Sequence, residues 1–220
     1  MKIEIGESLL YSWLRHEKKC QLVQMNWKAS PAWELKHAGE VENVINKVGV
    51  FFSGEYAYDL FKKSRSVRQI IRQAEVDVVG VCLAERGGKV TAVDVAFHKD
   101  GLGYGKSRKE TVEKVMSKLV KTAMCIYGYF DTKEAEIVFA SPKIPPKVLL
   151  DLQQATEQVK HILNESGFSF QIELIANEDF CDKVLEPILK YSKDVADTGE
   201  LFMRSYQMYK MFSGEKSPGS

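Results

Sequence analysis

Three acidic residues stand where apolar residues would be expected: Glu7, Asp77 and Asp94. Glu7 falls on the apolar stripe of the first predicted helix, where a buried acid is costly unless it is paired or binds a ligand. Asp77 and Asp94 lie inside two valine-rich segments that are typical of strands, although aspartate is disfavoured there. If these strands pair as a hairpin, the two carboxylates can lie on one face, and a divalent cation would remove their repulsion. Oxygen ligands favour Mg²⁺ or Mn²⁺, which activates water and stabilises charge on a phosphate.

Two of the three acids also have a structural explanation that needs no ligand. Glu7 lies near a helix start, where the helix dipole favours an acid. A position at the end of a strand, facing water, would explain Asp77. Asp94 is harder to explain in this way, because apolar residues flank it on both sides. Taken together, we expect the three carboxylates to converge at one edge of a folded sheet and to share a divalent ion.

The hydrophobic pattern predicts the elements that would position these acids. Near-continuous valines over 75–83 and 90–98 predict a hairpin that is covered on both faces. Ser107 and Glu110 form a capping box for the helix that follows. The other predicted helices begin near Gly6 or Glu7 and cover 41–50, 56–71, 145–165, 179–191 and 199–212, and the other strands cover 20–27, 135–140 and 168–174. This order predicts an α/β sandwich, in which helices flank a central mixed sheet.

Over roughly residues 5–141, this arrangement resembles the restriction-endonuclease-like superfamily of PD-(D/E)XK nucleases. That family's core is a helix with a Glu, a strand, a hairpin with Asp and (D/E)XK, then a helix and a strand. Here Glu7 is on the first helix, Glu-Val-Asp at 75–77 resembles the family's Glu-hydrophobic-Asp variant, and Asp-Val-Ala at 94–96 lies on the second hairpin strand. The resemblance implies a restriction-endonuclease-like domain that hydrolyses DNA phosphodiester bonds. It also implies that Glu7, Asp77 and Asp94 are catalytic and hold Mg²⁺ or Mn²⁺.

The chain departs from the family at the motif lysine, because Ala96 stands in its place. His98 lies two residues further, on the same face of a strand, and is a candidate for assisting the nucleophile. In some relatives the following helix supplies the lysine, and Lys106 and Lys109 near the start of that helix are candidates here. Pro31-Ala-Trp-Glu-Leu-Lys36 spells the motif literally, but it has no upstream Asp on a neighbouring strand, and we interpret it as accidental unless Lys36 folds back to the site.

Basic and aromatic residues flank the predicted site and are candidates for contacting nucleic acid. Phosphate contacts need cations of this kind, and the candidates are Arg65, Arg68, Arg72, Lys106 and Lys109. Trp27 and Trp33 could stack on bases. The structural alternatives are a solvated helix face for the cations and core packing for the two tryptophans.

The composition is that of an ordinary globular chain, with 220 residues, 45% hydrophobic, 28% charged and a formal net charge of +1. Because the net charge is near zero, a polyanion would have to bind to local basic patches. Four separated cysteines without a CxxC pair argue against a zinc knuckle or a disulfide framework and favour a reducing cytoplasm. No apolar run approaches the roughly 20 residues that cross a bilayer, so no membrane partner is expected.

We expect one domain over 1–213, with a core at about 5–175, a helical insert at about 37–73, C-terminal helices at about 178–212 and a disordered tail at 214–220. DNA is the expected partner, and the resemblance is compatible with a homodimer. Two other functions stay open. One is a catalytically degenerate member that binds nucleic acid or a protein without cleavage. The other is an α/β interaction module in which the acids form salt bridges.

Overall fold

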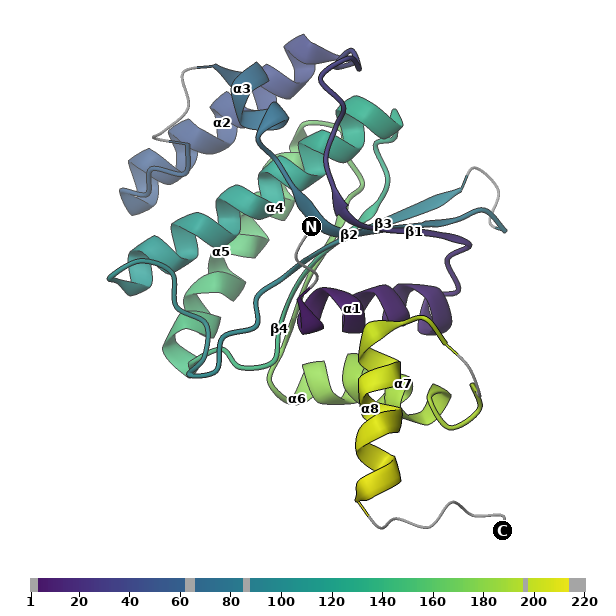
Figure 1. The fold of residues 1–220 in the computed structure, drawn as a ribbon. Helices are drawn as coiled ribbons and strands as arrows, with labels where there is room; N and C mark the ends of the chain where they lie inside the picture. The colour runs from purple at the N-terminus through teal and green to yellow at the C-terminus, as the bar shows by residue number, and fades with distance from the viewer. Residues whose placement is uncertain (1–3, 62–65, 85–87, 196–197, 214–220) are drawn as a thin grey trace.

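The computed structural model describes residues 4–61, 66–84, 88–195 and 198–213, and its centre is a five-stranded mixed sheet (Figure 1). The strands lie side by side in chain order: β1 (Leu22–Trp27), β2 (Val76–Cys82), β3 (Lys89–Val95), β4 (Glu136–Ser141) and β5 (Gln171–Ala176). β2 runs antiparallel to β1 and β3, whereas β3, β4 and β5 run parallel. The predicted α/β class with a mixed sheet is confirmed.

Helices cover both faces of this sheet (Figure 1). One face carries α2 (Ala38–Tyr56), α3 (Val67–Arg72), α4 (Arg108–Phe130) and α5 (Pro146–Glu165). The other face carries α1 (Ile5–Ser12), the π-helix η1 (Trp13–Glu17), α6 (Glu178–Phe180), the π-helix η2 (Cys181–Leu185), α7 (Glu186–Tyr191) and α8 (Leu201–Phe212). None of the helices among the described residues has the length and apolar character needed to cross a membrane.

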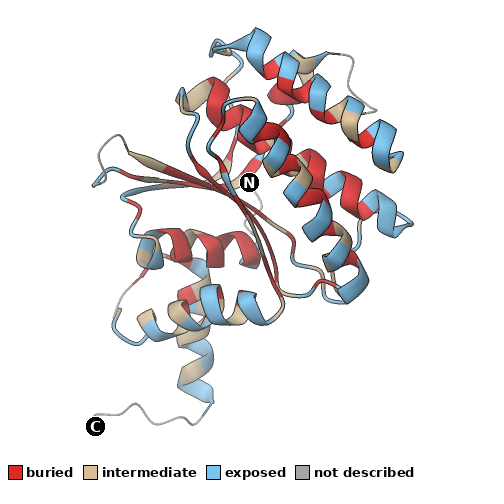
Figure 2. Ribbon diagram, turned by 180° about the vertical axis from the view of Figure 1, so that it is seen from behind, coloured by how far each residue is buried: buried red, intermediate tan, exposed pale blue. Residues whose placement is uncertain are grey.

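Two hydrophobic cores result, one on each side of the sheet, and Figure 2 shows buried residues lining both. The valines of the hairpin explain why both exist, because successive side chains on a strand point to opposite faces. Val79 and Ala92 belong to the core under α4, whereas Val78 and Val93 belong to the core over α1. The hairpin is therefore covered on both faces, as its valine content predicts.

The predicted helix starts are confirmed where a specific residue sets them. The Ser107 hydroxyl accepts a hydrogen bond from the Glu110 amide at 3.1 Å and caps α4, which is the expected use of an N-cap serine. Pro146 is the first residue of α5, and Gly167 follows that helix with φ +83°, in the region that favours glycine.

Several predicted boundaries are wrong. The helix expected over 41–50 covers Ala38–Tyr56, and the strand expected over 168–174 covers Gln171–Ala176. The helix expected over 56–71 is not continuous: α2 already ends at Tyr56, where Ala57 takes a left-handed conformation, and α3 covers only Val67–Arg72. The strand expected to begin at Cys20 begins at Leu22, and the strand expected to reach His98 ends at Val95. The expected tail at 214–220 lies outside the described residues, as do Arg65 and part of the predicted hairpin turn at 85–89.

Candidate active site

Asp77 on β2 and Asp94 on β3 lie on the same side of the hairpin, beneath α4. The Lys118 ammonium of α4 binds both, at 3.0 Å from Asp94 Oδ1 and 3.4 Å from Asp77 Oδ2. Thr122, one helical turn after Lys118, donates its hydroxyl proton to Asp94 Oδ2 at 2.8 Å. The expected juxtaposition of the two aspartates is thus present, and a lysine joins them.

The two aspartates differ in how completely the protein satisfies their oxygens. Asp94 is fully buried, and each of its carboxylate oxygens has a partner, Lys118 for one and Thr122 for the other. Asp77 is largely buried, and its Oδ2 accepts a hydrogen bond from the Val95 amide at 2.8 Å. Its Oδ1 makes no hydrogen bond to any residue that the structure describes. Asp77 therefore retains one oxygen without a partner among the described residues, whereas each oxygen of Asp94 has one partner.

Glu7 approaches from α1, on the other side of the sheet. It is 9% exposed, and Asn26 of β1 donates its amide proton to Glu7 Oε2 at 3.1 Å. Asn26 has a left-handed φ of 52°, within the stretch of β1 that pairs with the start of β2. Glu7 is therefore held near the hairpin by Asn26 rather than by a shared contact with the two aspartates.

The site carries more negative than positive charge. Burial raises the pKa of Asp77 to about 6; Lys118 opposes this rise, and the charges of Asp94 and Glu7 add to it. Burial disfavours the charged form of Lys118, but its pKa still lies above the usual value because Asp94 and Asp77 stabilise the ammonium. Two carboxylates share the Lys118 ammonium, and Glu7 adds negative charge near Asp77, which leaves a surplus of negative charge that an additional cation or a proton on Asp77 would relieve.

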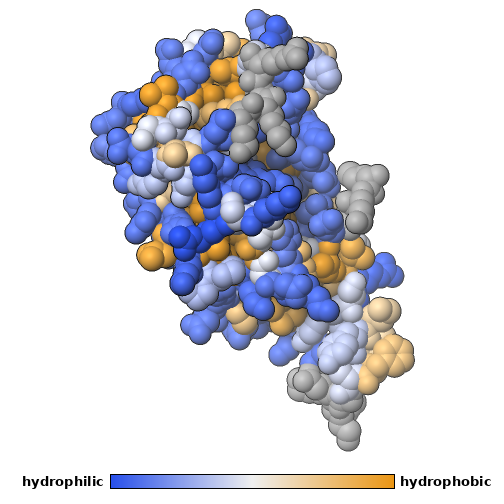
Figure 3. Space-filling view, turned by 90° about the vertical axis from the view of Figure 1, so that its left-hand side faces the viewer, coloured by the Kyte–Doolittle hydropathy of each residue, from blue (hydrophilic) through white to orange (hydrophobic). Residues whose placement is uncertain are grey.

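A polar cavity of about 570 Å³ opens beside this pair. Its walls are the α4 face that carries Lys118, the segments 59–61 and 73–75, and the ring of Tyr104, and Asp77 lines it. The Lys114 ammonium lies 4.2 Å from the centre of the Tyr104 ring and forms a cation–π contact. The face of the molecule in Figure 3 is mostly hydrophilic, with apolar side chains in separate patches. Because Asp77 and Lys118 both line the cavity, they are reachable from a space large enough for a nucleotide-sized group.

The other predicted catalytic candidates contact different partners. His98 packs its ring edge-on against Tyr104, with the ring centres 5.2 Å apart. The ammonium of Lys109 lies 3.9 Å from a carboxylate oxygen of Glu113, and Lys36 pairs with Asp131 at 2.8 Å. None of the ion pairs and hydrogen bonds of the described residues joins His98, Lys36, Lys106 or Lys109 to Asp77 or Asp94. Ala96 lies in the core under α4, at 3% exposure.

Lys118 is the site residue that the sequence pattern did not single out. It belongs to a dilute series of lysines on α4, of which Lys109 and Lys114 are exposed and Lys121 is half-buried. Its position carries a signal nevertheless: Val115 and Thr122, three residues before and four after it, are both buried and share its helix face. A lysine within the sheet-facing stripe of a helix needs a buried acid as its partner.

The predicted nucleic-acid contacts divide between surface and core. Arg68 and Arg72 are exposed on α3, and Lys106 and Lys109 are exposed around the start of α4. Trp27 is 4% exposed and packs in the core, whereas Trp33 is 52% exposed. Arg65 lies outside the described residues.

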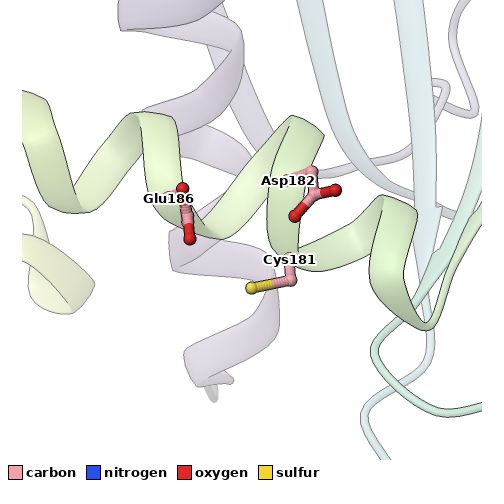
Figure 4. Close-up of side chains that lie close together, drawn as sticks. All are labelled: Cys181, Asp182 and Glu186. Carbon is pink, nitrogen blue, oxygen red and sulfur yellow. The ribbon is translucent and has the colours of Figure 1, made fainter.

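Metal-ligating side chains gather most closely at a different place. Within the ranges that the structure describes, one group of possible metal ligands has its ligand atoms all within 4.8 Å of one another. It consists of Cys181, Asp182 and Glu186 (Figure 4). Asp182 and Glu186 are exposed, and exposed acids of this kind commonly occur without a metal. Glu7, Asp77 and Asp94 do not meet the same distance condition.

Comparisons of the chain with family models, with curated proteins and with solved structures found no match.

Proposed function

We propose that this chain is a metal-dependent nuclease with a restriction-endonuclease-like fold that hydrolyses phosphodiester bonds in DNA. The observation that carries the proposal is the bridge from Lys118 to Asp77 and Asp94 at the wall of a polar cavity. Two aspartates on neighbouring strands and one lysine are the residue types that a PD-(D/E)XK site requires. In this chain the lysine comes from α4, which would compensate for Ala96.

The order of elements supports the same proposal. The chain runs α1, β1, β2, β3, α4, β4, with a helical insert of α2 and α3 between β1 and β2. Apart from the insert, this is the order that the resemblance implies. Glu7, Asp77 and Asp94 lie on α1, β2 and β3, the elements that carry the family's acids.

The donor set fits a divalent cation such as Mg²⁺ or Mn²⁺. All candidate ligands are oxygens, which these hard ions prefer, and Asp77 Oδ1 is available as an acceptor. The negative surplus around Asp77 favours a cation over a neutral ligand. Asp77 and Asp94 would hold the ion, with Glu7 near it. When bound, it would supply an activated water and stabilise charge on the phosphate.

The chain's own residues supply positioning and one cation. The Val95 amide and Thr122 fix the orientations of Asp77 and Asp94, respectively. The Lys118 ammonium has three donors, so it can retain Asp94 while another donor contacts a phosphate oxygen or the attacking water. This is the role that the motif lysine has in the family, and the chain would fulfil it from α4.

A specific observation favours the alternative, a relative that binds nucleic acid or a protein partner without cutting. Both oxygens of Asp94 already have protein partners, and Asp94 is fully buried. Lys118 can therefore be interpreted as a permanent replacement for the cation, which would leave a stable ion-paired core. The two interpretations differ in whether a metal can bind beside Lys118.

A cleavage assay separates them. Labelled single-stranded, duplex and branched DNA would be incubated with the protein in Mg²⁺ and in Mn²⁺. We expect product with the wild type and none with Asp77→Asn or Lys118→Met, whereas Asp100→Asn, in an exposed loop, should cut normally. DNA binding without product under every condition would favour the alternative. Full activity in Asp77→Asn would remove the proposed site.

A further inference from the structure

An exposed tryptophan lies on a base of buried and half-buried aromatic rings. Trp33 is 52% exposed, and its ring centre lies 6.3 Å from that of Trp27 and 6.3 Å from that of Tyr129. Trp27 and Tyr129 contact each other edge-on at 6.0 Å. The rings beneath Trp33 hold it in place, so that little conformational entropy is lost when another flat group stacks on it.

Two arginines accompany these rings. Arg68 and Arg72 are exposed on α3, four residues apart on one helix face. Neither makes an ion pair with the described part of the chain. Burial raises the pKa of Tyr129, and the positive charges of Arg72 and Arg68 oppose this rise, so both arginines act on the same aromatic group. The nearby acid Glu75 is paired with Lys28 at 2.9 Å, which removes a source of repulsion for phosphate.

This aromatic surface is connected to the candidate active site by three elements. Trp27 on β1 pairs with Val76, the residue before Asp77. Gln73 and Ala74, which follow α3, line the cavity. Tyr129 lies eleven residues after Lys118 on α4, which corresponds to about 16 Å along the helix axis. A chain of a few nucleotides could therefore reach from Trp33 to Lys118.

We propose that Trp33, supported by Trp27 and Tyr129 and flanked by Arg68 and Arg72, binds an unpaired base of single-stranded nucleic acid. The inference rests on the proposed function, because it names the form of substrate that would be led to that site. Aromatic stacking accepts every base, and arginines supply the backbone contacts, so binding is independent of sequence. A duplex hides its base faces within its own stack, which is why the surface fits a single strand or a single-stranded end.

Binding can be measured without cleavage, in EDTA, by fluorescence anisotropy with labelled oligothymidylate and with a duplex of equal length. We expect the single strand to bind more tightly. Trp33→Ala should weaken its binding roughly five- to a hundred-fold, and Trp33→Phe should restore most of it. Combined Arg68→Ala and Arg72→Ala should reduce the slope of log affinity against log salt by about 0.7 for each phosphate that the two arginines neutralise.

Matched controls lie on α8, on the opposite side of the sheet. Phe212→Ala removes a ring that is 86% exposed, and Arg204→Ala removes an exposed arginine; both should bind DNA as the wild type does. Unchanged melting temperatures would show that the Trp33 variants are folded. Equal binding by wild type and Trp33→Ala, a preference for duplex, or no binding of single strands by the wild type would each overturn the inference.

The test also separates this inference from the proposed function. If binding depends on Trp33 but no metal supports cleavage, the proposal of base binding at Trp33 is supported and the proposal of nuclease activity is contradicted. If cleavage needs Asp77 but does not depend on Trp33 on any form of DNA, the proposal of nuclease activity is supported and the proposal of base binding at Trp33 is contradicted.

Discussion

Replacing Asp77 by Asn should stabilise the protein in the absence of metal. Burial, opposed by Lys118 and reinforced by Asp94, raises the pKa of Asp77 from 3.8 to about 6. Each pKa unit corresponds to about 1.4 kcal/mol, so ionised Asp77 costs the folded state up to about 3 kcal/mol above pH 6. The carboxamide removes this charge, and its oxygen can still accept the hydrogen bond from the Val95 amide.

The cost of ionised Asp77 to the stability of the wild type depends on the pH. Below about pH 4, Asp77 is protonated in the folded and unfolded states and costs nothing. Between about pH 4 and 6 the folded state keeps the proton that the unfolded state releases, so the stability of the wild type falls as the pH rises. Asp77→Asn should therefore approach the wild type in stability as the pH falls to about 4 and exceed it by up to about 3 kcal/mol at about pH 8.

Urea denaturation in EDTA across this pH range measures the difference directly. Asp131→Asn is a matched control of opposite sign, because hydrogen bonds from Lys36 and His37 lower the pKa of the exposed Asp131. That variant should be less stable than the wild type throughout this range, because the stabilisation from a lowered pKa is fully present above the carboxyl pKa of the unfolded state. If Asp77→Asn is no more stable than the wild type at about pH 8, or shows the same pH dependence, the charge surplus inferred for the site is refuted.

Three further substitutions test the packing at the site, in the hairpin and at an exposed position of α2. Lys118→Met should destabilise the protein by about 3 kcal/mol in urea denaturation, since it leaves two neighbouring carboxylates without their cation; an unchanged midpoint would contradict the ion-pair geometry. Gly80→Ala should cost about 1–3 kcal/mol, because its Cβ would lie 2.9 Å from the sulfur of Cys20. Gly54→Ala, a helical position with no atom within 4 Å of the added Cβ, should instead stabilise by about 0.5–1 kcal/mol; a loss at both positions would argue against a specific clash.

The hairpin and the aspartate pair could be predicted from the sequence because their signal is local and covalently constrained. Valines on both faces of 76–82 and 89–95 require cover on both sides, and a short turn between two strands enforces antiparallel pairing. Asp77 and Asp94 then come together whatever the rest of the chain does. The capping serine of α4 and the proline that begins α5 are signals of the same local kind.

The remaining features depend on contacts between distant segments. Lys118 reaches the aspartates only because α4 crosses the hairpin in one orientation, which no local pattern fixes. Glu7 was expected at the shared ion, but its partner is Asn26, whose left-handed conformation within β1 has no clear sequence signal. The helix predicted over 56–71 is wrong because Tyr58 and Leu60 pack against the core from a non-helical segment, so tertiary packing overrides helical spacing.

Titration of the protein with Mn²⁺ by calorimetry tests the central proposal most directly. At about pH 8, where Asp77 is ionised, the wild type should bind Mn²⁺, and Asp77→Asn should lose most of that affinity although its fold is as stable or more stable. Glu186→Gln, at the exposed Cys181, Asp182 and Glu186 group, should bind Mn²⁺ as the wild type does. No binding by the wild type, or equal binding by wild type and Asp77→Asn, would contradict a metal site at Asp77 and Asp94.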